Sequence, residues 1–168
     1  MKTGLFAITI ACATSLSAAS PHVLTMTSLG NVRIGMTLRE LQRAFGGRLT
    51  NSDGTSESDS CWVYHRGDGS DKEVGYMIER GQLTRIEVSA EGSPTTQTES
   101  GIEIGSSLAE LRRAYGAKLL VERNTQGDRF ILNAPDHRRA IIFETDGRVV
   151  TTFRVGIYPS VTYNEGCE

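Results

Sequence analysis

The stretch Ile34-Gly-Met-Thr-Leu-Arg-Glu-Leu-Gln-Arg-Ala-Phe-Gly-Gly-Arg-Leu49 recurs seventy residues later as Ile104-Gly-Ser-Ser-Leu-Ala-Glu-Leu-Arg-Arg-Ala-Tyr-Gly-Ala-Lys-Leu119. Nine of the sixteen positions are identical, where ordinary residue usage gives about one by chance. Most other positions hold physically similar residues, such as Thr37 and Ser107. A repeat of this length predicts two copies of one structural unit.

Each copy predicts a short amphipathic helix. Thr37 with Glu40, and Ser107 with Glu110, match the capping box, in which the hydroxyl accepts from a helical amide and the carboxylate accepts from the amide of the cap residue. Apolar residues then recur at helical spacing, and a glycine follows each run. Two repeated acids could also suggest an acid–base pair, but capping explains their position more simply. Helices this short need a sheet to pack against.

Six strands are predicted after these helices. They are Cys61–His65, Gly75–Ile78 and Leu83–Val88 in the first copy, and Arg129–Leu132, Ala140–Glu144 and Val149–Val155 in the second. Turn signals at Arg80-Gly81 and Asp146-Gly147 join the last two strands of each copy. Short strands at Val32–Ile34 and Ile102–Ile104 could precede the helices. We therefore expect an α+β fold in which two helix-plus-meander modules join their sheets into one antiparallel layer, with both helices on one face and the other face open.

Composition divides the chain into five parts. We expect a signal peptide at residues 1–19, a first repeat module at 28–90, a linker at 91–100, a second module at 101–156 and a C-terminal tail at 157–168. The signal peptide is predicted from Lys2, an apolar run and the small residues Ser17-Ala18-Ala19. Export to the periplasm or outside the cell follows from it. An alternative is a lipoprotein acylated at Cys12.

Charge and hydropathy exclude two classes of partner. The predicted mature chain carries 17 basic and 20 acidic residues, a net charge of −3, because Lys2 is the only charged residue that the signal peptide removes. There is no basic excess for nucleic acid, and no second apolar run is long enough to span a membrane as a helix.

Two cysteines remain after the signal peptide. An even number in an exported chain favours a disulfide between Cys61 and Cys167, with two free thiols as the alternative. If Trp62 and Tyr64 share one face of their strand, Cys61 and Val63 share the other. A bridge would then tie the tail across one of these faces.

The open sheet face is the expected binding surface for a protein partner. Trp62 and Tyr64 are candidate aromatic anchors, although core packing is the alternative for both. Arg85, Glu87 and Arg154 are candidate polar contacts. The pattern leaves open which residues face outward, because a one-residue slip exchanges the two faces.

No catalytic residue, metal ligand or cofactor is predicted. The histidines are scattered, at His22, His65 and His137, and no nucleophile motif accompanies them. The acidic loop containing Asp68, Asp71 and Glu73 lacks the spacing of a calcium loop. We interpret it as a solvated hairpin tip.

The segment Ile34–Gly46, with its Gly-Met-Thr cap, short helix and closing glycine, resembles the opening of small-protein-A-type domains, the family of the BamE envelope lipoproteins. Two such units in tandem in an exported chain also resemble the beta-lactamase inhibitory protein family, which implies a saddle-shaped sheet that binds an enzyme. That family has a disulfide inside each module, and this chain has one candidate bridge that reaches its tail. The tail itself resembles those of uncharacterised exported bacterial proteins. The resemblance assigns no functional residue.

The sequence thus predicts an exported, non-catalytic binding protein that presents a sheet face to a protein partner. A sharper version, inhibition of a secreted or periplasmic hydrolase, rests on fold analogy alone. The alternatives are a factor for envelope assembly or maintenance and an enzyme whose site the sequence does not reveal.

Overall fold

The computed structural model describes residues 22–51, 60–90, 95–123, 127–164 and 166–167. The predicted signal peptide, including Cys12, lies outside the described residues. The described part contains the helices α1 (Leu38–Phe45) and α2 (Leu108–Tyr115) and the 3-10 helices η1 (Gly116–Lys118) and η2 (Ser160–Thr162). Its strands are β1 (His22–Leu24), β2 (Ser28–Leu29), β3 (Val32–Arg33), β4 (Leu49–Asn51), β5 (Cys61–Arg66), β6 (Val74–Glu79), β7 (Gln82–Val88), β8 (Thr96–Thr98), β9 (Leu119–Glu122), β10 (Arg129–Asn133), β11 (Arg139–Thr145) and β12 (Val150–Ile157).

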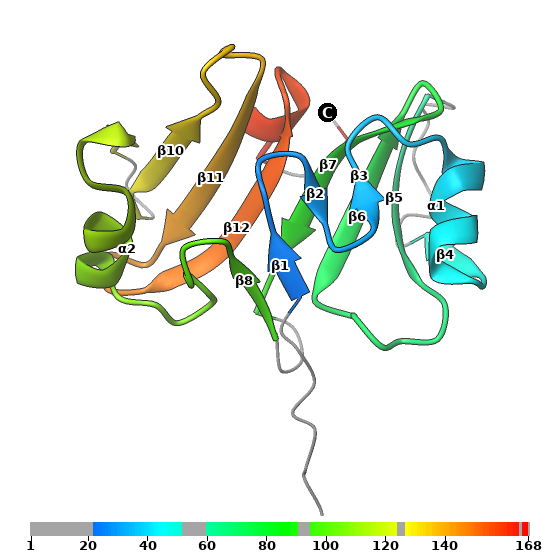
Figure 1. The fold of residues 1–168 in the computed structure, drawn as a ribbon, viewed down its shortest axis with the longest axis horizontal. Coiled ribbons are helices and arrows are strands. Elements are labelled where there is room, and N and C mark those ends of the chain that lie inside the picture. Colours follow the sequence, from blue (N-terminus) through cyan, green and yellow to red (C-terminus); the bar gives the residue numbers. More distant parts are fainter. Residues whose placement is uncertain (1–21, 52–59, 91–94, 124–126, 165, 168) are drawn as a thin grey trace, which may run out of the picture.

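The fold is mixed α+β with two sheets (Figure 1). The large sheet has eight strands in the order β4-β5-β6-β7-β12-β11-β10-β9, and all of its neighbouring strands are antiparallel. The two halves of this sheet meet where β7 pairs with β12, with Ile86 opposite Val155. The six predicted strands are confirmed as β5, β6, β7, β10, β11 and β12.

A small sheet was not predicted. Its order is β3-β2-β1-β8, and β8 pairs in parallel with β1. Residues 96–98 therefore form a strand where the sequence suggested only linker, because they find a partner far away in the chain. The segment expected to form a strand at Ile102–Ile104 contributes only an isolated bridge between Glu103 and Gln97.

Both helices and the small sheet cover the same side of the large sheet, which we call the inner face (Figure 1). Leu41 of α1 and Leu111 of α2 are completely buried there, as is Leu24 of the small sheet. Aromatic side chains of the large sheet, such as Tyr76 and Phe143, complete this core. The apolar stripe of each short helix is thus the part that anchors it.

The capping boxes are confirmed in both helices. The amide of Thr37 donates to the carboxylate of Glu40 at 2.8 Å, and the amide of Ser107 donates to Glu110 at 2.7 Å. Gly46 ends α1 at φ 63° in the left-handed region, as predicted. The other glycine expected to end a helix adopts a different conformation, and the chain continues from it into η1.

The same backbone bonds connect each helix start to the large sheet. Gly35 donates to the carbonyl of Leu83 at 2.7 Å, and Gly105 donates to that of Val150 at 2.8 Å. Leu83 and Val150 in turn donate to the carbonyls of Met36 and Ser106 at 2.7 and 2.9 Å. Each helix is therefore held at an equivalent place, beside the last strand of its own half.

The opposite side of the large sheet, the outer face, is not fully open as expected. The C-terminal segment crosses it, and Val161 of η2 packs in a second small core with Ile131, Ala140 and Ile142. Cys61 and Cys167 form the disulfide, with Cα atoms 5.7 Å apart. The tail covers part of this face because the side chain of Val161 buries aliphatic groups of the sheet that would otherwise contact water.

Candidate functional site

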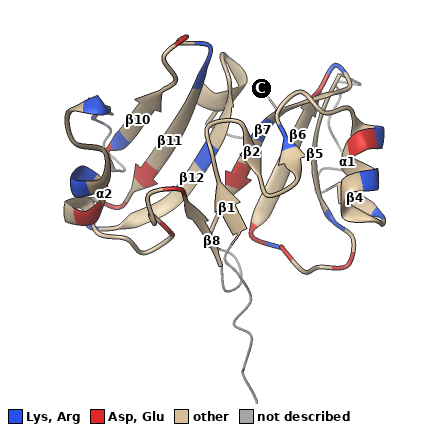
Figure 2. Ribbon diagram, in the orientation of Figure 1, with Lys and Arg blue, Asp and Glu red and all other residues tan. Residues whose placement is uncertain are grey.

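A row of five charged side chains crosses the middle of the outer face: Arg85 and Glu87 on β7, Arg154 on β12, Glu144 on β11 and Arg129 on β10. Glu87 contacts Arg85 at 3.4 Å and Arg154 at 3.5 Å. Glu144 contacts Arg154 at 2.8 Å and Arg129 at 3.2 Å. Basic and acidic positions thus alternate across four neighbouring strands, as the adjacent charged segments of β7, β12 and β11 show in Figure 2.

Strand register places this row on one face. Arg154 lies opposite Glu87, and Arg129 lies opposite Glu144. Residues opposite one another in antiparallel strands point to the same side of the sheet, where opposite charges attract.

The two buried arginines of this row also hold the C-terminal segment. The side chains of Arg85 and Arg154 are only 4% and 1% exposed. Arg154 donates through Nε to the carbonyl of Val161 at 2.8 Å. Arg85 donates through Nη1 to the carbonyls of Tyr163 at 3.0 Å and Ser160 at 3.3 Å. Burial lowers the pKa of the Arg85 guanidinium, which the Glu87 carboxylate opposes; an arginine nevertheless stays charged in a protein.

Polar contacts fix the tail at two more points. The hydroxyl of Ser160 donates to the carboxylate of Glu79, which also accepts from the hydroxyl of Thr84 at 2.6 Å. Arg129 donates to the side-chain oxygen of Asn164. The tail is therefore an integral part of the outer face and is held by both halves of the sheet.

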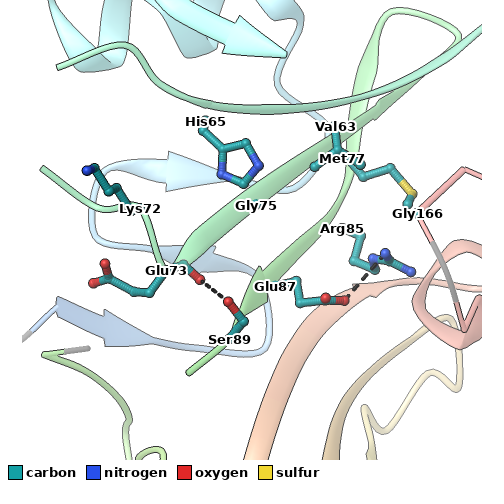
Figure 3. Close-up of a pocket in the computed structure, with 10 residues that line it drawn as sticks. All are labelled: Val63, His65, Lys72, Glu73, Gly75, Met77, Arg85, Glu87, Ser89 and Gly166. Carbon is teal, nitrogen blue, oxygen red and sulfur yellow. Dashed lines mark hydrogen bonds and ion pairs between the residues drawn. The ribbon is translucent and has the colours of Figure 1, made fainter. Parts of the chain in front are cut away.

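The first half of the outer face keeps a hollow of about 330 Å³ beside the tail (Figure 3). Its wall and floor include Val63 and His65 of β5, Gly75 of β6, Glu87 of β7 and, on the tail, Gly166. It is shallow and mixed in character, with apolar, cationic and anionic groups around one space.

Gly75 forms part of the floor of the hollow. Gly75 lies opposite Glu87, and the β5–β6 register brings His65 to its other side. A Cβ atom at Gly75 would lie 3.3 Å from Cγ1 of Val63 and 3.7 Å from Cε1 of His65. A side chain at this position would therefore press against these two neighbours.

His65 is oriented by a backbone contact. Its Nδ1 lies 2.9 Å from the carbonyl oxygen of Val74, which can only accept, so Nδ1 carries the proton in this contact. A neutral ring then has an acceptor at Nε2. Ser89 donates through its hydroxyl to the carbonyl of Glu73 at 3.4 Å, and Lys72 is exposed at the rim (Figure 3).

The five predicted binding residues do not form one surface, which corrects the sequence interpretation. Tyr64 lies opposite Tyr76 and packs against the inner core, and Trp62 lies opposite Ile78 on the same inner side. Arg85, Glu87 and Arg154 point to the outer face, where Arg85 and Arg154 are buried and donate to carbonyls of the C-terminal segment. Burial of the core fixed the face that each residue occupies, and sequence periodicity alone could not.

The sequence missed the hollow and the role of the tail. Val63 and His65 alternate with the two aromatic residues of β5, so the strand pattern contained them without selecting them. One signal did point to the tail: Cys61 shares the outer side of β5 with Val63, and its disulfide draws Cys167 to that side.

The acidic loop is solvated at Asp68, as the sequence suggested, but not at its other two acids. Asp71 and Glu73 are only 3% and 8% exposed. Asp71 accepts from the hydroxyl of Tyr76 at 2.9 Å, and its other carboxylate oxygen is buried without a hydrogen-bond partner. Burial raises the pKa of Asp71 and, together with the Asp71 carboxylate, that of the Tyr76 phenol.

Within the described residues, no three His, Cys, Asp or Glu side chains gather in a way that could hold a metal ion. No helix in that part of the chain combines the length and apolar character that crossing a membrane requires. His22 lies exposed in β1, and His137 lies exposed in a turn at φ 53°.

Comparison with known proteins gives a fold without a function. No known family model matches the chain, and no curated protein matches it. The uncharacterized protein YfeY from Escherichia coli has a similar structure, with a TM-score of 0.53 and 12% identity over 80% of this chain and 99% of that chain. At that identity the likeness concerns the fold alone.

Two further solved structures are more distant. A cysteine-rich secretory protein from Staphylococcus aureus subsp. aureus Mu50 has a TM-score of 0.44 and 12% identity, over 74% of this chain and 44% of that chain. A DUF4309 family protein, YjgB, from Bacillus subtilis subsp. subtilis str. 168 has a TM-score of 0.44 and 14% identity, over 72% of this chain and 78% of that chain. Neither likeness is close enough to bear on function.

Proposed function

We propose that this chain is an exported, non-catalytic binding protein that holds a segment of a protein partner in the hollow over β5, β6 and β7. The observation that carries the proposal is the hollow at Gly75, where Val63, His65 and Glu87 surround a space of about 330 Å³. A protein segment can place one side chain there while its backbone lies along the tail.

Rigidity supports a binding role. Glu87 is held by two arginines, and the ring of His65 is held by a backbone carbonyl. Groups already fixed in position lose little conformational entropy when a partner binds. In the same proposal, the disulfide supports export, because disulfides persist in oxidising compartments.

We further propose that the two halves of the large sheet derive from one duplicated unit. The support is the pair of capping boxes, together with matched backbone hydrogen bonds from Gly35 and Gly105 to the last strand of each half.

Inhibition of an exported hydrolase is the sharper form of the binding proposal. In that form, the partner segment held in the hollow belongs to the rim of the hydrolase active site.

The test is capture by the immobilised protein from the exported fraction of the cells that produce it. Lys72→Glu reverses the charge at the rim, and Gly75→Ala narrows the floor. The matched controls are Arg39→Glu, on the exposed side of α1, and Gly47→Ala, where a Cβ meets only one backbone oxygen at 3.9 Å.

A partner that binds wild type and both controls, and binds the two hollow variants at least about tenfold more weakly, supports the proposal. The purified partner is then assayed for hydrolase activity with and without this protein. Equal capture by all five proteins contradicts a partner site in the hollow.

A further inference from the structure

Strand β9 forms an apolar free edge of the large sheet. Within the described part of the chain it pairs only with β10. Leu120 and Val121 on this edge are 58% and 42% exposed, the two most exposed large hydrophobic side chains among the described residues. The opposite edge, β4, instead exposes Thr50 and Asn51. An exposed apolar edge offers unpaired backbone groups to a strand from another molecule.

The sequence of this edge is complementary to itself. Strand β9 reads Leu119-Leu120-Val121-Glu122, and Lys118, the last residue of η1, directly precedes it. When two copies align antiparallel with Leu120 opposite Leu120, Lys118 of each copy faces Glu122 of the other, and Leu119 faces Val121. Every apolar residue then meets an apolar residue, and both acids meet bases, which favours cross-strand pairing.

Other registers lose this match. A shift by one residue in one direction sets Lys118 against Arg123, a like-charge pair. A shift in the other direction sets Lys118 against Val121. The charges therefore select one alignment, in the way that charged pairs set partner and register in other assemblies.

The geometry of the sheet agrees with this alignment. Leu120 lies opposite Ile131, and Glu122 lies opposite Arg129, so both point to the outer face. A two-fold axis perpendicular to the sheet pairs two antiparallel edges and keeps both outer faces on the same side. The helices of both copies stay on the inner side of the combined sheet.

We propose that β9 joins two copies of this chain into a two-fold symmetric dimer with one continuous antiparallel sheet. The paired edge is only a few residues long, so the area it buries falls well below the roughly 1,200 Å² of total surface typical of stable interfaces. The dimer is therefore weak, and dissociates in a range of about 10 µM to 1 mM. It would place two hollows on one surface and strengthen binding to any partner with two sites.

The first experiment measures the mass of the purified chain by sedimentation velocity from about 10 µM to 1 mM. A rise toward dimer is expected for wild type. Lys118→Glu and Glu122→Lys each set like charges against one another and should shift the midpoint at least about tenfold higher. The double variant Lys118→Glu/Glu122→Lys restores opposite charges and should restore the dimer.

Thr50→Lys is the control, because it adds a charge at the other edge of the same sheet and should leave the dimer unchanged. Circular dichroism verifies that each variant is folded. A second measurement needs no variant: exchange of those alternate β9 amides that face away from β10 should slow as the protein concentration rises.

Three outcomes overturn the proposal. One is a wild-type chain that stays monomeric at about 1 mM. This result overturns the dimer even if the edge of β9 binds a strand from another protein. Another is a double variant that dimerises no better than the single variants. The third is a dimer that Thr50→Lys abolishes, since this would place the contact at β4.

Discussion

In the half of the large sheet that packs on α1, the outer surface keeps a hollow around Gly75, whereas in the half that packs on α2 the C-terminal segment covers it. The inner surfaces of the same two halves are closely alike. Leu41 and Leu111 are both completely buried, each on a helix with the same capping box. The two halves thus share a capped helix with a buried leucine on the inner side and differ on the outer side.

This difference separates what the fold requires from what it leaves free. A short helix is only marginally stable alone and must bury its apolar stripe. In both halves the helix therefore packs on the inner face of the large sheet. The outer face of an antiparallel sheet can meet water and carries no such requirement. The two halves therefore differ on the side where the core does not depend on them.

The largest expected effect tests the similarity of the inner sides. Leu41→Ala and Leu111→Ala each remove a buried side chain and leave a cavity, so each should lower the free energy of unfolding by about 3 kcal/mol. Urea denaturation measures both. Gln42→Ala, on the exposed side of α1, is the control and should stay within about 0.5 kcal/mol of wild type. If only one of the two substitutions lowers the free energy of unfolding by less than about 1 kcal/mol, the two helices do not contribute equally to the core, and the similarity of the inner sides is contradicted.

The next effect tests the difference between the outer sides. The double variant Cys61→Ser/Cys167→Ser opens a bridge between residues 106 positions apart and should cost about 2–4 kcal/mol. With the bridge gone, the contacts from Arg85 and Arg154 must hold the tail without it. We expect faster amide exchange at Thr162 and Tyr163, which η2 protects in the native protein.

The control in that experiment lies inside the same molecule. The amides of Leu41 and Leu111 donate helical hydrogen bonds to the carbonyls of Thr37 and Ser107, and their exchange rates should change only with global stability. If the tail amides stay as protected as these two, the arginines alone hold the tail, and the bridge is not what makes the outer sides differ.

Local sequence signals predicted much of the fold. The capping boxes at Thr37 and Ser107 and the hairpin turns at Gly81 and Gly147 are decided within a few residues, and all four were found as expected. The two glycines have φ of 80° and 89°, a conformation that glycine adopts without strain.

Long-range pairing was beyond that kind of signal. The parallel contact of β1 with β8 joins His22 to Thr96, and no local pattern announces it. The edge strands β4 and β9 are too short for a clear alternation. For the candidate site, residue types pointed to Arg85, Glu87 and Arg154, but the inner position of Trp62 and Tyr64 follows from core packing.

The smallest effect returns to the repeated caps. Thr37→Ala and Ser107→Ala each remove the hydroxyl that accepts a hydrogen bond from a helical amide. Each should lower the free energy of unfolding by about 1 kcal/mol. Near-equal shifts in the urea midpoint would extend the similarity of the halves to their helix starts. A cost confined to one helix would show that the other is held by packing alone.

Acid titration sharpens that last comparison. Hydrogen bonds from Thr37 lower the pKa of Glu40, and hydrogen bonds from Ser107 lower that of Glu110, both from an ordinary value of 4.5. Stability from a lowered pKa is fully present above the unfolded value and is lost as pH falls through the folded value. Glu110→Gln keeps a side-chain acceptor for the cap but cannot titrate, so its urea midpoint should fall less steeply than wild type below about pH 4.5. Glu40→Gln should flatten the curve in the same way.

The control for this titration is the comparison of each variant with wild type. Burial raises the pKa of Asp71, so Asp71 favours the folded state in acid, and only the difference between variant and wild type isolates the caps. Curves that stay parallel to wild type would contradict a role for the carboxylates in either cap.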